Sequence, residues 1–273
     1  MYDIDWNPII FSIGTLEIRW YGVLVVLAVI AVIVLSLVEA RRRGISQDII
    51  WDAALWAVVG GIIGARLLHV IDRWQYYLYH PEQLLNFAGL AIWGAVLGGL
   101  IAIFIFCLVK KISFWLLGDV AAPGAILGQT IGRVGCLVNG CCYGLTCELP
   151  MAVIYSNPNS YAPIGVPLYP TQLFHIIWDL AGFVVLWLLR KKLKPEGTLF
   201  LLWLIFFGAG DFIIRFFRES EPFLFNLPQA QVIDILMVVA AVITLVVRYV
   251  LYRRAGGMVE RSEVSKSAQN QAG

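Results

Sequence analysis

Seven apolar runs of about 20 residues constrain the fold of this chain more than any other feature of its sequence. A helix of that length matches the thickness of the hydrocarbon core of a bilayer. Because lipid offers the backbone no hydrogen-bond partner, such runs can cross a bilayer only as helices or as closed barrels. The predicted spans are residues 18–38, 49–71, 89–109, 113–131, 170–189, 197–216 and 231–251.

The remaining sequence leaves no room for a separate soluble domain. Hydrophobic residues make up 60% of the chain and charged residues 14%, and the longest polar excursion, 143–169, is short. We therefore expect an all-α polytopic membrane protein, with one seven-helix domain over 1–254 and a polar, disordered cytoplasmic tail over 255–273. The first residues lack a basic region and a cleavage site, so we expect the first span to be retained. A net charge of +2 gives no indication of a nucleic-acid partner.

Basic residues predict the orientation. They follow every odd-numbered span, and cytoplasmic ends of spans are enriched in lysine and arginine. The N-terminus is therefore predicted outside and the C-terminus inside. The basic residues at the inner ends include Arg41, Arg42, Arg43, Lys110, Lys111, Arg190, Lys191, Lys192, Lys194, Arg253 and Arg254.

Six basic residues fall instead in or beside the outer half of the predicted membrane, and all six are arginines. An arginine within a span costs about 2.5–3.5 kcal/mol on insertion scales, so it needs a function or a partner. Its guanidinium suits phosphate, which suggests an outward-facing cavity for a phospholipid headgroup. The alternative is that each arginine extends to the interface. They are Arg19, Arg66, Arg73, Arg133, Arg215 and Arg218.

The stretch 132–144 (GRVGCLVNGCCYG) is the strongest candidate for a site. Glycines let a backbone approach a ligand closely. Backbone this rich in glycine is not expected to be plain helix at membrane depth unless protein or water satisfies its polar groups. Arg133 in this stretch is a bidentate donor suited to phosphate.

Four cysteines, Cys136, Cys141, Cys142 and Cys147, lie within twelve residues of one another. Such clustering raises a zinc site, outer-face disulfides or a thiol oxidoreductase as possibilities. The cluster has no CxxC pair and no histidine nearby. We therefore do not predict a metal here, and leave a disulfide of Cys147 open.

Polar side chains recur at helical spacing in the other spans. Arg66 and His69 share one helix face, as do Gln172 and His175. Asp211 and Arg215 have the i,i+4 spacing of an ion pair, with a structural role as the alternative to a functional one. Glycines at 60, 61 and 64, and again in GLAIWGAVLGG at 89–99, favour close helix packing.

Taken together, these motifs resemble the prolipoprotein diacylglyceryl transferase family. The central stretch resembles its signature, and the other pieces occur in the family's order along almost the whole chain. These are RWYG at 19–22, GAR at 64–66, GLAIWG at 89–94, YPTQLF at 169–174 and FFR at 216–218.

The resemblance implies an enzyme of the bacterial inner membrane with its active site toward the outer face. Its substrates would be phosphatidylglycerol, a membrane lipid, and the lipobox cysteine of a prolipoprotein signal peptide. Transfer of the diacylglyceryl group to the thiol would release glycerol 1-phosphate, without a metal or organic cofactor. By this resemblance Arg133 contacts the lipid phosphate, and Tyr21, Arg66, Asn139 and Gly144 match motif positions.

The chain departs from the family pattern in ways that concern the proton acceptor. Trp93 stands where many relatives have a histidine proposed as a base. Cys136 and Cys141 stand where well-studied relatives have asparagine and glutamate. Asp211 and Arg215 reverse the order of an arginine–glutamate pair.

These departures leave two histidines as substitute bases. Phosphate binding would fall to Arg133 with help from Arg66, Arg215 and Arg218, and the base would be His69 or His175. There are two alternatives. One is a catalytically silent lipid-binding relative, which the presence of Trp93 in place of the histidine would favour. The other is a transporter. A transporter would need polar groups through both halves of the membrane, which the sequence does not offer.

Overall fold

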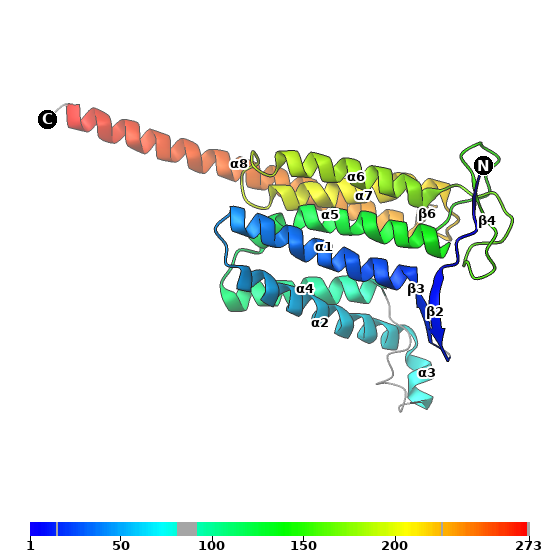
Figure 1. Ribbon diagram of the computed structural model, residues 1–273. Helices are drawn as coiled ribbons and strands as arrows, with labels where there is room; N and C mark the ends of the chain where they lie inside the picture. The colour runs from blue at the N-terminus through cyan, green and yellow to red at the C-terminus, as the bar shows by residue number, and fades with distance from the viewer. Residues whose placement is uncertain (15, 81–91, 225, 272–273) are drawn as a thin grey trace. The chain divides into compact units, whose positions relative to one another are not determined.

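The computed structural model describes the chain except residues 15, 81–91, 225 and 272–273. For residues 16, 92–93, 222 and 255–271 it describes the backbone but not the side chains. Within that part, each predicted span coincides with a long helix, and one short helix precedes α4 (Figure 1). The helices are α1 (Trp20–Arg42), α2 (Gln47–Asp72), α3 (Trp74–Tyr79), α4 (Ile92–Lys110), α5 (Phe114–Asn139), α6 (Thr171–Leu189), α7 (Thr198–Ile214), the 3₁₀ turn η2 (Arg215–Phe217) and α8 (Gln229–Gln271).

The chain is a mostly helical polytopic membrane protein. Among the described residues, five helices are long and apolar enough to cross a membrane, namely α1, α2, α6, α7 with η2, and α8 as far as Arg254. Gly94–Lys110 in α4 is a shorter apolar helix. α5 is not among the five, because Asp119, Gln129, Arg133 and several glycines lower its hydropathy. The count of seven spans stays a prediction.

Short strands correct the all-α expectation. Three two-stranded sheets lie outside the helices, where loop backbone must find hydrogen-bond partners of its own. β1 pairs in parallel with β4, so the first residues of the chain join the loop before α6. The pairs are β1 (Tyr2–Ile4) with β4 (Val153–Tyr155), β2 (Ile9–Ile13) with β3 (Leu16–Arg19), and β5 (Pro222–Leu224) with β6 (Leu227–Pro228).

The C-terminal segment is part of the last helix. α8 continues to Gln271, which includes residues 255–271, and the predicted disorder of this tail stays a prediction. Alanine, glutamate, arginine and lysine in this segment favour helix. The division into a membrane domain over 1–254 and a separate tail stays a prediction.

The described chain forms two compact units. The first comprises Met1–Val32 and Ala121–Gly273, and the second comprises Ile33–Val120. In the first unit, α6 packs on α7 and α7 on α8. α5 joins them through a buried cluster of Ala122, Ile126, Leu186 and Leu199.

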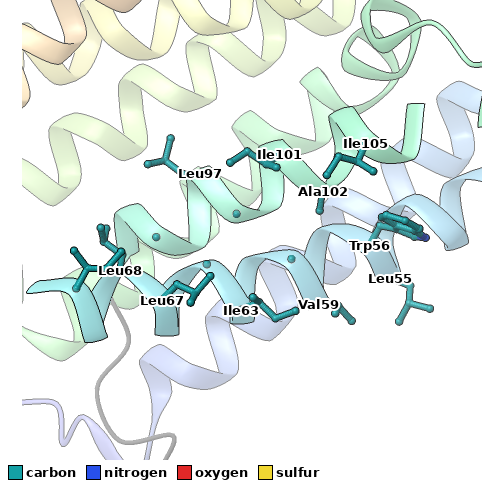
Figure 2. A pocket seen from close by; sticks show the side chains of 15 residues that line it. Leu55, Trp56, Val59, Ile63, Leu67, Leu68, Leu97, Ile101, Ala102 and Ile105 are labelled. Atoms are coloured by element: carbon teal, nitrogen blue, oxygen red, sulfur yellow. The ribbon is translucent and has the colours of Figure 1, made fainter. Parts of the chain in front are cut away.

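The second unit is built on close contact between α2 and α4. A Cβ added at Gly64 would lie 2.3 Å from the carbonyl oxygen of Gly94, and one at Gly98 would lie 2.3 Å from that of Gly60. The predicted role of these glycines in close packing is therefore confirmed. These two helices line an apolar groove of about 640 Å³. Figure 2 shows side chains that line it, among them Ile63 and Leu97.

Gly98→Ala should destabilise the second unit by about 1–3 kcal/mol, because the new methyl group cannot avoid the backbone of α2. Gly99→Ala is the matched control, since its Cβ would meet the nearest atom only at 3.4 Å. Thermal unfolding of both variants in detergent measures the difference. Equal melting temperatures would contradict the packing argument.

Candidate functional site

The stretch 132–144 forms the last two turns of α5 and the turn that follows. The structure corrects the expectation that this stretch departs from helix, because α5 stays helical to Asn139. Gly135 serves helix packing here: a Cβ on it would lie 3.2 Å from Cδ2 of Tyr21 on α1. Small size at this position therefore lets Tyr21 lie against the end of α5.

After Asn139 the chain reverses through left-handed backbone. Gly140 has φ +70°, and a Cβ on it would lie 1.9 Å from Oγ of Ser160. The N–H of Cys141 donates to the carbonyl of Cys136 at 3.0 Å, which folds the turn back over the helix end. Cys142 then adopts φ +61°, a conformation that is uncommon for a residue with a side chain.

The start of α6 holds this turn in place. The amide of Gln172 donates to the carbonyl of Cys141 at 2.7 Å, and the hydroxyl of Thr171 donates to that of Cys142, also at 2.7 Å. Thr171 and Gln172 are both almost fully buried. Hydrogen bonds in such an environment are costly to lose, so they fix the backbone of both cysteines.

A buried tyrosine completes the support. The hydroxyl of Tyr155, which belongs to β4, donates to the carbonyl of Leu137 in the last turn of α5 at 3.0 Å. Burial raises the pKa of Tyr155 above its ordinary value. The phenol therefore stays protonated as a hydrogen-bond donor at all physiological pH values.

Gly144 lies where three segments meet. Its N–H donates to the carbonyl of Tyr169 at 3.0 Å, and the next N–H, of Leu145, donates to that of Phe217 at 2.8 Å. A Cβ on Gly144 would lie 2.6 Å from the Phe217 oxygen and 2.6 Å from Cβ of Tyr169. No side chain fits at this position without moving the backbone near η2.

Asp211 is the centre of a buried charged cluster. Its carboxylate lies 2.5 Å from Nε of Arg215, which confirms the predicted i,i+4 pair. It also lies 3.5 Å from Nη2 of Arg133 and 3.5 Å from Nε2 of His175. Asp234 at the start of α8 lies 3.8 Å from Arg215. The cluster thus joins α5, α6, α7 and α8.

The three cysteines of the turn form a second cluster. The sulfur atoms of Cys136, Cys141 and Cys142 all lie within 4.8 Å of one another. Hydrogen bonds from the thiols of Cys136 and Cys141 lower the pKa of the Cys142 thiol, and the positive charges of Arg218 and Arg133 lower it further against the effect of burial. This cluster is therefore coupled electrostatically to two of the outer-half arginines.

Cys147 lies outside that cluster. It is buried, and its N–H donates to the carbonyl of Pro167 at 2.9 Å. All five cysteines are free thiols, so the disulfide that the sequence leaves open is not formed in this structure.

Asn139 connects the helix end to the N-terminal segment. Its side-chain oxygen accepts a hydrogen bond from Arg19 at 3.3 Å, and Arg19 also pairs with Glu17 at 2.9 Å. The guanidinium of Arg19 lies 4.3 Å from the ring centre of Tyr161. Arg19 thus has specific protein partners instead of simply reaching for the interface.

Comparison with known proteins adds to this geometry. The family model described as prolipoprotein diacylglyceryl transferase matches residues 8–247. The chain belongs to this family. A phosphatidylglycerol–prolipoprotein diacylglyceryl transferase of Dehalococcoides mccartyi is 43% identical over 243 residues, covering 89% of this chain and 94% of the relative. Relatives of the same name from Limosilactobacillus reuteri and Lysinibacillus sphaericus are 36% and 34% identical, and each comparison covers about nine-tenths of both chains.

Most positions expected from the diacylglyceryl transferase motifs fall in the first unit. Tyr21, Arg133, Asn139 and Gly144 lie at or beside the C-terminal end of α5. His175, Arg215 and Arg218 belong to the same unit and come from α6, from η2 and from the residue after η2. The structure therefore gathers these seven predicted positions within one unit.

Arg66 and His69 belong instead to the second unit. Arg66 lies 5.2 Å from the ring centre of Tyr77, and the ring of His69 meets the same tyrosine edge-on at 6.1 Å. The two residues share one helix face, as their spacing indicates. Their predicted part in phosphate binding and catalysis stays a prediction, and the side chain of Trp93 lies outside the described residues.

Sequence reasoning missed the residues that support the turn. Tyr155 and Thr171 carry no pattern that marks them as partners of α5. Thr171 lies within the family segment YPTQLF, which was a weak signal for that residue alone. Their role follows from chain segments that are distant in sequence and meet only after folding.

Gly144→Ala should abolish activity or lower it by at least about tenfold, because a backbone shift as small as 1 Å near reacting groups costs about 100-fold. Gly132→Ala in the same stretch is the matched control, since its added Cβ would meet nothing within 4 Å. Lipid transfer to a lipobox peptide is measured for both. Loss of activity in the Gly132 variant alone would contradict this assignment.

Proposed function

We propose that this chain transfers the diacylglyceryl group of phosphatidylglycerol to the lipobox cysteine thiol of a prolipoprotein and releases glycerol 1-phosphate. The observation that carries the proposal is family membership across residues 8–247. The relatives that match most of the chain bear the names of this activity. The arginine cluster at the end of α5 offers the chemistry that the reaction needs.

The reaction is an alkyl transfer to sulfur. The thiolate of the lipobox cysteine attacks the glyceryl carbon that carries the phosphate ester. A carbon–sulfur bond forms, the carbon–oxygen bond breaks, and its electron pair leaves with the phosphate oxygen of glycerol 1-phosphate. A free thiol has a pKa of about 8.5, so its proton must leave before or during the attack.

In this proposal Arg133 stabilises the departing phosphate. Its guanidinium lies at a corner of the charged cluster, 3.5 Å from Asp211 and partly exposed, so it remains accessible to a ligand. Arg215 is held by the same carboxylate, and Arg218 follows one turn later. Preorganised cations in a site of low dielectric stabilise a developing negative charge more than they do in water.

We further propose the bacterial inner membrane as the location, with the site toward the outer face. Within the first unit, the C-terminal end of α5 and the N-terminal end of α6 meet at the site. The lysines at 191, 192 and 194 follow the opposite end of α6. The positive-inside rule then assigns the site to the outer side.

Arg133→Ala should lower transfer by about 100–1,000-fold, which is the usual cost of removing one donor from an anion-stabilising site. The assay uses purified protein in vesicles that contain labelled phosphatidylglycerol, with a lipobox peptide as acceptor and mass spectrometry of the product. Arg253→Ala on α8 is the control and should retain full activity. Near-normal transfer by the Arg133 variant would sink the phosphate assignment, whereas no transfer by the unaltered protein would indicate a silent relative.

A double variant, His69→Gln with His175→Gln, tests the two histidines as the base. If either histidine accepts the thiol proton, the double variant should lose about 100-fold or more in rate near neutral pH. It should regain part of this rate as the pH approaches the pKa of the substrate thiol. Unchanged activity at all pH values would remove both candidates.

A further inference from the structure

The three-cysteine cluster has no part in the mechanism above. Cys136 is buried in the last turn of α5, and Cys141 and Cys142 are half-buried in the turn after it. Their sulfur atoms lie within 4.8 Å of one another. All three are free thiols, so this is the reduced form of the cluster.

We propose that Cys136 and Cys141 form a reversible disulfide across the end of α5, and that this bond switches the neighbouring transferase site off. The first half of this statement concerns the chemistry of the thiols alone. The second half rests on the proposed function, because it needs a transferase site to act on.

The backbone at the end of α5 explains why these two side chains meet. The N–H of Cys141 donates to the carbonyl of Cys136 at 3.0 Å, and inside this bond the N–H of Gly140 donates to the carbonyl of Leu137 at 3.3 Å. Gly140 lies between them in the chain with φ +70°. These features define a Schellman motif, in which the residue after the left-handed glycine commonly packs its side chain on the residue whose carbonyl it caps. Here both of those residues are cysteines.

Two observations favour this pair over the other two that the cluster allows. The thiol of Cys141 donates to the carbonyl of Cys136 at 3.7 Å, so its sulfur already lies beside the backbone of that residue. Cys141 and Cys142 are adjacent, and consecutive Cα atoms are about 3.8 Å apart, below the range of about 4.4–6.8 Å that most disulfides have. Cys142 is therefore left as the free thiol of the oxidised cluster.

The bond forms by thiol–disulfide exchange with a soluble disulfide, which is the oxidant. The half-buried thiol of Cys141 is open to it, and the outer face proposed for the site is a compartment in which disulfides persist. One thiolate of the pair attacks the oxidant, which releases one thiol and leaves a mixed disulfide. The second thiolate then displaces the other half. The two cysteines lose two protons and two electrons, and the oxidant becomes two thiols.

The bond acts on the site because it closes a ring that contains part of it. A disulfide holds its two sulfur atoms about 2.05 Å apart, closer than any two free thiols can approach. Closing this gap pulls the turn toward the helix, and Asn139 moves with it because it lies between the bridged residues. Asn139 is the partner of Arg19 and matches a motif position of the family. A shift of about 1 Å near reacting groups costs about 100-fold in rate.

A count of free thiols tests the bond. Reduced, purified full-length protein is equilibrated with oxidised and reduced glutathione at a series of ratios, quenched with acid, alkylated after unfolding and weighed by mass spectrometry. The reduced chain should take a label on each of its five cysteines, and the oxidised chain should take two fewer with no glutathione attached. Full labelling at every ratio would overturn the disulfide, and so would a stable glutathione adduct in its place.

Single cysteine-to-serine variants locate the bond. Cys136→Ser and Cys141→Ser should keep all their remaining thiols free at every glutathione ratio, because each lacks one partner. Cys142→Ser should still lose two labels, as should the controls Cys107→Ser and Cys147→Ser, which remove buried thiols outside the cluster. Loss of two labels in the Cys136 or Cys141 variant would overturn the pairing, and so would full labelling of the Cys142 variant.

Lipid transfer before and after oxidation tests the switch. The oxidised chain, freed of glutathione, should transfer at least about tenfold more slowly than the reduced chain, and dithiothreitol should restore the rate. A second thiol count after the assay verifies that the peptide has not reduced the bond. Cys136→Ser should have the same rate before and after treatment. Equal rates for the oxidised and reduced unaltered chain would overturn the switch and leave the transferase intact, whereas a disulfide without transfer in either state would sink the proposed function and leave the bond.

Discussion

The end of α5 depends on finding partners for its last carbonyl groups. A helix leaves its final C=O groups without intrahelical donors, and Asn139 at this helix end is almost fully buried. Here the donors come from other parts of the chain. Leu137 is satisfied by Tyr155, Asn139 by the N–H of Tyr161, and the two carbonyls beyond the helix by Gln172 and Thr171. The loop before α6 and the start of α6 are fixed in the same step.

The same arrangement brings charges and thiols together. With the helix end fixed, Arg133 on its last turns meets Asp211 of α7, and the turn presents three sulfur atoms within 4.8 Å of one another. Desolvated charges are stable only when they are paired. Asp211 therefore forms ion pairs with both Arg133 and Arg215. In the proposed mechanism, Arg133 would exchange part of its contact with this carboxylate for contact with the lipid phosphate.

Glycine has two different roles in this protein. In the second unit Gly60, Gly64 and Gly98 allow two helix backbones to approach closely, which is a role in packing. At the site, Gly140 supplies left-handed backbone and Gly144 makes room for Phe217 and Tyr169. The first role follows from spacing alone, because small residues four apart share a face. The second depends on which segments arrive from elsewhere, and spacing does not reveal them.

The sequence by itself determined the class of protein, the position of each long helix and the family, because lipid permits apolar runs only one kind of local backbone and because the motifs occur in order. It also determined the Asp211–Arg215 pair, which is a contact within one helix. Only the tertiary structure decided that β1 pairs with β4, that Thr171 and Tyr155 hold the end of α5, and that Cys136 meets Cys141 and Cys142. Helices are specified by local hydrogen bonds and periodicity, whereas these contacts join residues whose meeting depends on the whole fold.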